Sequence, residues 1–520
     1  MGRLLAGLRA GGSAVRSQTF AVVVGFAAGL LVAALVLPNH QSVKVVGGAA
    51  TGGSSSDVAA GSGGDTAAAG APGATDASGG ATTATGGATT AGTAAPAVSQ
   101  GGASSGGSQQ QASTGNGGST AQGVSATSIK VGISIFDVSA YKYLGDVANV
   151  GDIKQQWDAV FDQWHHDGTL PVNGRDIQPV YRTHSVGTTG GDPASERATC
   201  TGFANDDKVF MVVGTASYTT GADCVASEFH LPILVDTGMS DDKLARDKPY
   251  LFSIGTSMSR LLRNFVHWAD ANHFLTGHKI GIYTLNDAET QDMFNKNVVA
   301  EMAKMGAKPA AQASTDNNLG GPNDAIAVQQ FRAAGVDVVM LFAAPGGFSQ
   351  QAQSQGYHPK YITTDFNYET ADSSAGLMPA EQYEGSAALT GRRDGEGAAG
   401  AKEDDKQEAC LKNYERFSGR TIQRHTANKS DPVEYRQILL TCDEAEILIE
   451  SLKAAGPTLT KTSLIQAMET SFNNWQSRDY PHVTWSAAQH DGVQQQRTLI
   501  AHTSCNCWQA SGDLGPWWVP

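Results

Sequence analysis

Between residues 128 and 364 the chain alternates between two patterns of apolar residues. Short apolar runs rich in β-branched residues, such as residues 209–213 and 232–235, are typical of strands covered on both faces, as in parallel sheets. Between such runs, apolar residues recur at spacings of three and four, which predicts helices with one buried face. Residues 152–166 show this spacing at Ile153, Trp157, Val160, Phe161 and Trp164. The pattern therefore predicts repeated strand–helix–strand units.

Strands are expected at residues 128–135, 177–181, 209–213, 232–235, 250–252, 279–285, 336–343 and 361–364. Regular strand–helix alternation predicts a doubly wound parallel sheet, so the fold class is α/β. Two such runs in succession predict two lobes with a cleft between them. We expect the first lobe to contain residues 127–250 and 385–480, and the second to contain residues 251–384 and 481–520.

The later part of the chain adds two helices and a tail of strand-forming residues. Residues 431–456 begin with Asp-Pro-Val-Glu, an order that fits a helix cap, a proline at the first helical position and a capping-box acid. A second helix is expected at residues 464–468. The tail contains Trp508, Trp517 and Trp518, and packing against a lobe is favoured over stacking on sugars.

The loops after residues 213 and 235 are expected at the carboxyl edge of a parallel sheet, where open α/β sheets bind ligands. The first loop is small and hydroxylic and contains Ser217 and Thr219, and the second contains Thr237. Phe136, at the end of the opening strand, is expected at the same edge. Asp365 follows the last strand of the series and fits both a ligand contact and a helix cap.

An uncharged apolar run at residues 19–37 is close to the length that spans a hydrocarbon core of about 30 Å. Arginines precede it and only Lys44 follows closely, which predicts that residues 1–18 are cytoplasmic and the rest lies outside the cell. A cleaved signal peptide has a shorter apolar region, about 7–15 residues, so the length favours a single-pass anchor in the cell membrane. Small residues at 48–50 leave cleavage and secretion open.

Residues 38–126 consist mainly of Gly, Ala, Ser and Thr, and no aromatic residue occurs between Phe20 and Phe136. Such a segment cannot bury enough apolar area to offset its chain entropy. We therefore expect a disordered, flexible spacer.

Six cysteines, all at or beyond position 200, favour disulfides in a chain with an export segment. The predicted pairs are Cys200–Cys224 and Cys410–Cys442. Cys505 and Cys507 fit an internal pair, free thiols or metal ligands, of which metal is the least favoured.

Several quoted stretches carry a family resemblance through their order and spacing. They are IKVGISI, GRDIQPVYRTHSVGTTGGDPASE, KVFMVVG with the Ser/Thr loop, LPILVDTG, HKIGIYTLNDAE, GVDVVMLFA, KYITTD and YRQILLTCDEAEILIESLKAAG. Together, over about residues 127–510, they resemble the type I periplasmic solute-binding proteins, in particular the branched-chain amino acid and amide group. The resemblance implies two lobes joined by a three-strand hinge that closes around a ligand.

Carried over by position, the resemblance places the groups that hold an amino-acid carboxylate at residues 217–219 and at Ser240. Asp365 matches the acidic residue that meets the ligand's ammonium. Two residues depart from the family pattern: Tyr218 stands where a small serine is usual, and Glu289 where an aromatic residue commonly covers the ligand. These departures leave a different ligand open, including a smaller or more cationic one.

The leading hypothesis is an extracytoplasmic protein that captures a small polar solute, an amino acid or amide, for an ABC transporter permease. The alternative is a membrane-tethered sensor or scaffold with the same two-lobe fold. No Walker-type loop, HExxH motif or serine motif between a strand and a helix occurs, so neither an enzyme nor a cofactor or metal site is expected. The formal net charge of −14 argues against nucleic acid as a partner.

Overall fold

The computed structural model describes residues 117–137, 139, 149–187, 190–215, 218–366 and 369–516. The predicted membrane segment at residues 19–37 and most of the predicted spacer lie outside these ranges, as do Trp517 and Trp518. No helix within the described ranges is both long and apolar enough to cross a membrane.

A six-stranded sheet forms the first lobe, with the strand order β3-β2-β1-β4-β5-β6. Neighbouring strands are parallel except for β2 and β3. The strands are β1 (Ser128–Asp137), β2 (Asp176–Gly187), β3 (Gly190–Gly191), β4 (Met211–Gly214), β5 (Ile233–Val235) and β6 (Leu251–Ser253). Met211 and Val213 belong to the core on one face and Val212 to the core on the other, because side chains alternate along a strand. The unbroken apolar run of β4 therefore reflects burial on both faces, as predicted.

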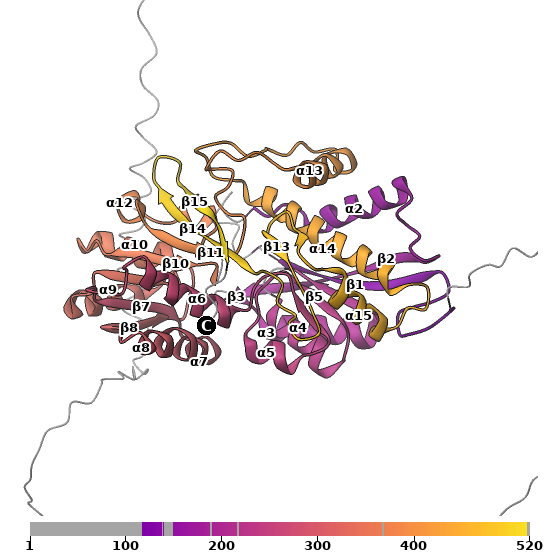
Figure 1. Ribbon diagram of the computed structural model, residues 1–520, viewed down its shortest axis with the longest axis horizontal. Coiled ribbons are helices and arrows are strands. Elements are labelled where there is room, and N and C mark those ends of the chain that lie inside the picture. The colour runs from indigo at the N-terminus through magenta and orange to yellow at the C-terminus, as the bar shows by residue number, and fades with distance from the viewer. Residues whose placement is uncertain are drawn as a thin grey trace, which may run out of the picture. The chain divides into compact units, whose positions relative to one another are not determined.

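Helices cover both faces of this sheet (Figure 1). One layer contains α2 (Ile153–Asp167), α14 (Val433–Ala455) and α15 (Lys461–Ser471), with α13 (Asp405–Ser418) packed on α2 and α14. The other layer contains α3 (Pro193–Thr201), α4 (Thr219–Asp223), α5 (Asp241–Arg246) and the π-helical segments η2 (Gly202–Asp207) and η3 (Cys224–Glu228). The predicted apolar face of α2 is buried, and the helix begins at its cap Asp152 and ends at Gly168, whose φ is 78°.

The second lobe is built on a seven-stranded sheet with the order β15-β14-β11-β10-β9-β7-β8. Strands β7 to β11 are parallel, whereas β14 and β15 pair antiparallel at one edge. Its strands are β7 (Ile280–Leu285), β8 (Ala311–Thr315), β9 (Val338–Leu341), β10 (Lys360–Thr364), β11 (Ala387–Thr390), β14 (Gln495–His502) and β15 (Cys507–Pro516).

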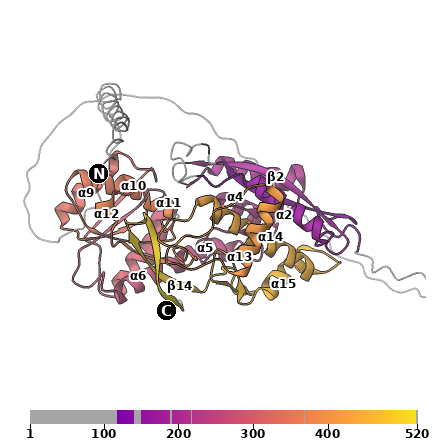
Figure 2. The same ribbon diagram turned by 90° about the horizontal axis from the view of Figure 1, so that it is seen from above.

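The helices of the second lobe also form two layers. One contains α6 (Met258–Ala271), α7 (Ala288–Phe294), η4 (Asn295–Val299) and α8 (Ala300–Lys304). The other contains α9 (Pro322–Ala334), α10 (Pro345–Ser354), α11 (Asp372–Ala375) and α12 (Ala380–Tyr383). In Figure 2, α9 to α12 lie together, apart from the first-lobe helices α2, α13, α14 and α15. Trp508 is buried against Tyr383, with ring centroids 5.4 Å apart, so this tryptophan packs the tail as predicted.

The chain passes between the lobes three times: after β6, after β11 and before β14. The boundaries differ from those expected. Strand β6 pairs with β5 in the first sheet, and β11 pairs with β10 in the second. Residues 482–493 begin with β13 (His482–Val483), follow β12 (Trp475–Gln476) and contribute Val483, Trp485 and Val493 to the core of the first lobe. Short apolar strands do not indicate which sheet they will extend, which is why the sequence misplaced these limits.

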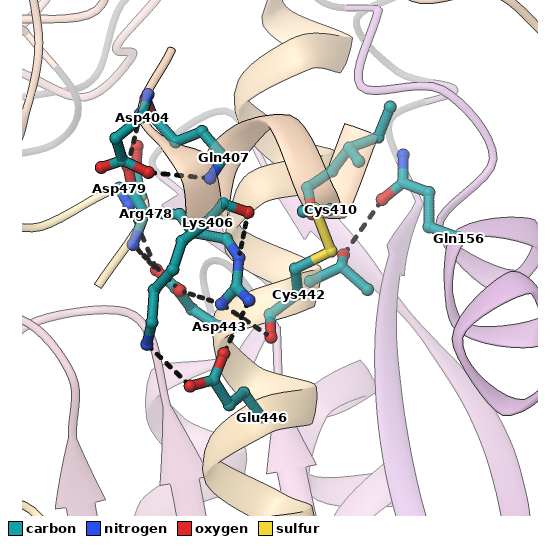
Figure 3. Close-up of a disulfide and its surroundings, with 12 residues drawn as sticks. Gln156, Asp404, Lys406, Gln407, Cys410, Cys442, Asp443, Glu446, Arg478 and Asp479 are labelled. Carbon is teal, nitrogen blue, oxygen red and sulfur yellow. Dashed lines mark hydrogen bonds and ion pairs between the residues drawn. A yellow bond between two sulfur atoms is a disulfide. The ribbon is translucent and has the colours of Figure 1, made fainter. Parts of the chain in front are cut away.

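A disulfide between Cys410 and Cys442 joins α13 to α14, as predicted (Figure 3). Beside it, the Arg478 guanidinium donates to Asp443 at 2.9 Å and to Glu446 at 2.6 Å. These contacts hold the segment after β12 against α14 and make the late helices part of the first lobe.

The other two disulfides lie within single lobes. Cys200–Cys224 joins α3 to η3, as predicted, and Cys505 pairs with Cys507 in the turn between β14 and β15. The internal pair is therefore the correct choice among the alternatives for Cys505 and Cys507.

The prediction of disorder up to residue 126 is wrong for residues 117–126. Val124 is buried, and the Lys130 N–H donates to the Gly123 carbonyl at 2.8 Å. The buried Arg175 donates to the carbonyls of Ser125 at 2.8 Å and Gly118 at 2.9 Å. The low-complexity composition hides this ordered part because its partner, Arg175, lies far away in the sequence.

Removing the Cys200–Cys224 disulfide should destabilise the protein more than removing Cys505–Cys507. The first closes a chain separation of 24 residues and the second a separation of 2. A disulfide that closes a longer loop removes more entropy from the unfolded chain. Replacing both cysteines of a pair with Ala should therefore lower the free energy of unfolding by about 3 kcal/mol for Cys200–Cys224 and about 1.5 kcal/mol for Cys505–Cys507. Urea unfolding without reductant measures both losses, and equal losses would contradict the expectation.

Candidate functional site

A cavity of about 320 Å³ lies between the carboxyl ends of the two sheets. This volume is at the small end of ligand pockets, which span about 300–1,000 Å³. The first lobe lines it with the start of α4 and with the loop after β5, and the second with the segments that follow β7 and β10. Two of the passages between the lobes, at residues 255–256 and 391–392, complete the wall.

Five of the eight predicted ligand-binding residues line this cavity: Thr219, Thr237, Ser240, Glu289 and Asp365. They come from both lobes. Thr219 and Thr237 lie in the loops expected at this sheet edge, whereas Ser240, Glu289 and the ligand role of Asp365 came from the family resemblance. Ser217 lies outside the described residues.

Two predicted residues do not line the cavity. Tyr218 is fully buried in the first lobe, where its hydroxyl donates to the Glu196 carbonyl at 3.4 Å and its ring lies 5.0 Å from that of His184. Gly221 leaves room for this ring, since a Cβ there would lie 2.2 Å from it. Phe136 packs against the first-lobe core instead. Both positions are near the predicted sheet edge, but Tyr218 turns into the core and the half-buried Phe136 packs against it.

The second lobe gives the cavity an apolar wall. Its members are Met258, Leu261, Leu285, Met293 and Phe366. Flexible thioether side chains adapt to the shape of a bound group, so this wall suits a hydrocarbon body of varied shape.

Both cationic side chains in the lining are already paired with acids. Lys243 of α5 lies 2.7 Å from Glu289 of α7, an ion pair that bridges the two lobes. The Arg392 guanidinium donates from Nε to Asp479 at 3.1 Å and lies over the Tyr480 ring at 4.9 Å. Neither cation therefore presents an uncompensated positive charge to the cavity.

Further ion pairs join α5 to the second lobe beside the cavity. Arg263 of α6 lies 3.0 Å from Asp241, and Lys296 of η4 lies 3.3 Å from Asp242. With Lys243–Glu289, these contacts hold the lobes close together at the mouth of the cavity.

Glu196 of α3 is a buried carboxylate in the first-lobe wall that the sequence analysis missed. Its Oε2 accepts from the Gly221 N–H at 2.9 Å, whereas Oε1 has no hydrogen-bond partner within the described part of the chain. Burial raises the pKa of Glu196 to about 7, although the N–H groups at the start of α4 and the charge of Lys243 act in the opposite direction.

Asp236 is a second buried carboxylate in the same wall, directly after β5. Its Oδ1 accepts from the Thr237 hydroxyl at 3.0 Å, and its Oδ2 has no hydrogen-bond partner in the ranges that the structure describes. Burial raises the pKa of Asp236 to about 6 against the opposing effect of Arg392. Asp236 could have been predicted from the sequence, because it directly follows a strand. Glu196 could not, since only the packing of α3 on α4 brings it to the cavity.

The remaining acids of the lining have partners within the protein. Asp365 accepts from the Thr370 hydroxyl at 2.7 Å and from the Gly391 N–H at 2.5 Å, and burial raises its pKa despite these bonds. It therefore ties the loops after β10 and β11 together. Asp287 caps α7 by accepting from the Thr290 N–H at 2.8 Å. Within the described ranges no group of three or more His, Cys, Asp or Glu side chains is arranged to hold a metal ion.

Replacing Glu196 with Gln should stabilise the ligand-free protein more at pH 8 than at pH 5. The ordinary pKa of this carboxyl is 4.5 and its folded value is about 7, so the folded state resists the ionisation that the unfolded chain undergoes as the pH rises. The free energy of unfolding of the wild type therefore falls as the pH rises from about 4.5 to about 7. The variant avoids this loss because Gln stays neutral. The gain at pH 8 should exceed the gain at pH 5 by about 1–3 kcal/mol in urea unfolding.

The matched control is Glu381→Gln, a change at an exposed position of α12. It should leave the free energy of unfolding within about 0.5 kcal/mol of the wild type at both pH values. A gain for Glu196→Gln that is the same at pH 5 and pH 8 would contradict the expectation.

Comparison with known proteins agrees with this architecture. The model of a family described as periplasmic binding protein matches residues 128–499. No curated protein matches. A branched-chain amino acid ABC transporter protein from Thermus thermophilus with bound valine is 14% identical, with a TM-score of 0.57, covering 75% of this chain and 98% of that one.

Two further solved structures share the fold. A leucine-binding protein from Thermotoga maritima is 12% identical, with a TM-score of 0.55 and coverage of 74% of this chain and 98% of that one. A solute-binding protein of an ABC transporter from Rhodopseudomonas palustris, in complex with 3,4-dihydroxybenzoic acid, is 17% identical, with a TM-score of 0.52 and coverage of 74% and 97%. Because the family model spans most of the chain, this protein belongs to the periplasmic binding protein family.

Proposed function

We propose that this protein is an extracytoplasmic solute-binding protein that holds a small polar ligand, of the amino-acid or amide type, between its lobes for an ABC importer. The observation that carries the proposal is the cavity between the two sheets, to which both lobes contribute polar side chains. Proteins of the same fold are named for valine, leucine and 3,4-dihydroxybenzoic acid, so this architecture accommodates small organic ligands.

Closure of the lobes is the mechanism that the geometry supports. The three passages between the lobes provide a hinge, and the ion pair between Lys243 and Glu289 joins α5 to α7 across the cavity. A ligand that contacts both walls favours the closed arrangement, because it binds that arrangement more tightly than an open one. The proposal requires no cofactor and no enzymatic step.

The second candidate is a membrane-tethered sensor or scaffold that does not serve a transporter. The apolar run at residues 19–37 and the long spacer that follows favour it, because they suit a domain held at a distance from the membrane. Loss of solute uptake on deletion of the gene supports the importer role, whereas unchanged uptake of a compound that binds the protein supports the sensor.

Thermal unfolding of the purified full-length protein with amino acids, amides and amines tests the proposal. A compound that binds the native state should raise the melting temperature by mass action. The variant Thr237→Trp, which places a large ring in the cavity wall, should abolish the increase. The control Ile326→Trp, at a position of α9 that is 61% exposed and outside the cavity, should retain it.

Two results would contradict the capture model. If no compound of the three classes raises the melting temperature, the scaffold role becomes the better account. If Thr237→Trp responds like the wild type, the ligand binds elsewhere.

A further inference from the structure

The place where an amino-acid carboxylate is expected already contains a carboxylate of the protein itself. By family resemblance, the hydroxyls and N–H groups around residues 217–219 would receive the ligand's carboxylate. In the structure the Gly221 N–H donates to Glu196 Oε2 at 2.9 Å, and the N–H groups of Thr219 and Thr220 also act on this carboxylate. A ligand carboxylate here would meet the negative charge of Glu196 rather than an open set of donors.

Two carboxylate oxygens in the first-lobe wall have no hydrogen-bond partner among the described residues. They are Glu196 Oε1 and Asp236 Oδ2, and both side chains are fully buried and line the cavity. Buried acceptors without a donor are rare in folded proteins, because each loses its hydration without replacement. The missing donors are therefore expected on the ligand.

The charges around the cavity favour a cation. The lining contains five acids, Glu196, Asp236, Asp287, Glu289 and Asp365, against the two cations Lys243 and Arg392. Lys243 is paired with Glu289, and Arg392 with Asp479, which stands outside the lining. Asp287 and Asp365 accept N–H or hydroxyl donors of the protein, whereas Glu196 and Asp236 each keep one buried oxygen without a partner among the described residues.

We propose that the ligand is a small amine without a carboxylate, and that Glu196 and Asp236 receive its ammonium group. The proposal rests on the proposed capture function and replaces its amino-acid or amide ligand with an amine. The apolar wall of the second lobe, formed by residues such as Met258, Leu285 and Phe366, receives the hydrocarbon body. The ammonium group is thus bound by the first lobe and the hydrocarbon body by the second. A single amine therefore contacts both walls and favours the closed arrangement of the lobes.

Binding should strengthen as the pH rises from 5 to 8. Protons compete with the ammonium for Glu196 and Asp236, whose pKa values lie at about 7 and about 6, while an alkyl ammonium stays charged over this range. Lys243 and Tyr218 face Glu196, and Arg392, Asp479 and Glu444 face Asp236. Arg392 and Arg436 hold the pKa of Asp479 below its ordinary value, and burial raises the pKa values of Glu444 and Tyr218.

Calorimetric titration of the full-length protein with two matched series tests the inference. The first series is isoamylamine, L-leucine and 4-methylpentanoate, and the second is phenethylamine, L-phenylalanine and 3-phenylpropionate. Within each series the hydrocarbon body is constant and only the charged groups differ. At least one amine should bind at least tenfold more tightly than its amino acid, the acids should not bind, and the affinity for the amine should rise at least fivefold from pH 5 to pH 8.

Variants of the wall separate this role from a structural one. Glu196→Gln and Asp236→Asn should each weaken amine binding at least tenfold, and the double variant should lose the pH dependence. Both remove a buried charge, so the ligand-free melting temperature should not fall at pH 8. Asp287→Asn, which alters another acid of the lining that caps α7, is the matched control and should change the affinity less than threefold.

The outcomes distinguish the inference from the proposed function. If an amino acid or an acid binds as tightly as its amine, the amine inference is overturned while the binding function stands. Unchanged amine affinity in Glu196→Gln and Asp236→Asn also overturns the inference. If neither amine binds while an amino acid or amide raises the melting temperature, the amine inference is overturned and the proposed function stands.

Discussion

The buried carboxylate of Asp479 joins the two lobes at the point where the chain passes between them. It accepts from Arg392, which follows β11 of the second lobe, and from Arg436 of α14 in the first, each at 3.1 Å. Burial alone would raise its pKa, but the two guanidinium groups hold it below the usual value. Buried charges are tolerated only when they are paired in this way. Because Arg392 also lines the cavity, this network fixes one end of the site to the hinge.

With the sheets fixed so that their carboxyl ends face each other, the two walls of the cavity differ in character. The first lobe contributes the buried acids Glu196 and Asp236, and the second contributes Phe366 and several methionine and leucine side chains beside its own acids Asp287, Glu289 and Asp365. The fold is shared with proteins of about 12–17% identity, a level at which the architecture is conserved without the ligand contacts. Ligand choice therefore depends on these local side chains, and the account of the function rests on them.

The sequence predicted the features that depend on local pattern. Apolar runs located β1, β2, β4 to β7, β9 and β10, although β8 and β11 were not predicted. Residues close after a strand, such as Thr237 and Asp365, line the cavity because carboxyl ends of parallel strands share one edge. It failed where side-chain direction or distant packing decides the outcome. Tyr218 follows the correct strand but turns into the core, and Glu196 reaches the site only because α3 packs on α4. The ordered segment around Val124 was missed for the same reason, since its anchor Arg175 is remote in the chain.

The central claim is that the two lobes enclose one small ligand whose positively charged end meets the first-lobe wall. A crystal structure of the protein with the tightest-binding compound tests it most directly. The account predicts a closed cavity with a ligand nitrogen within hydrogen-bond distance of Glu196 Oε1 and Asp236 Oδ2. A ligand carboxylate bound at the start of α4 with Glu196 displaced, or a ligand bound outside the cavity, would contradict it.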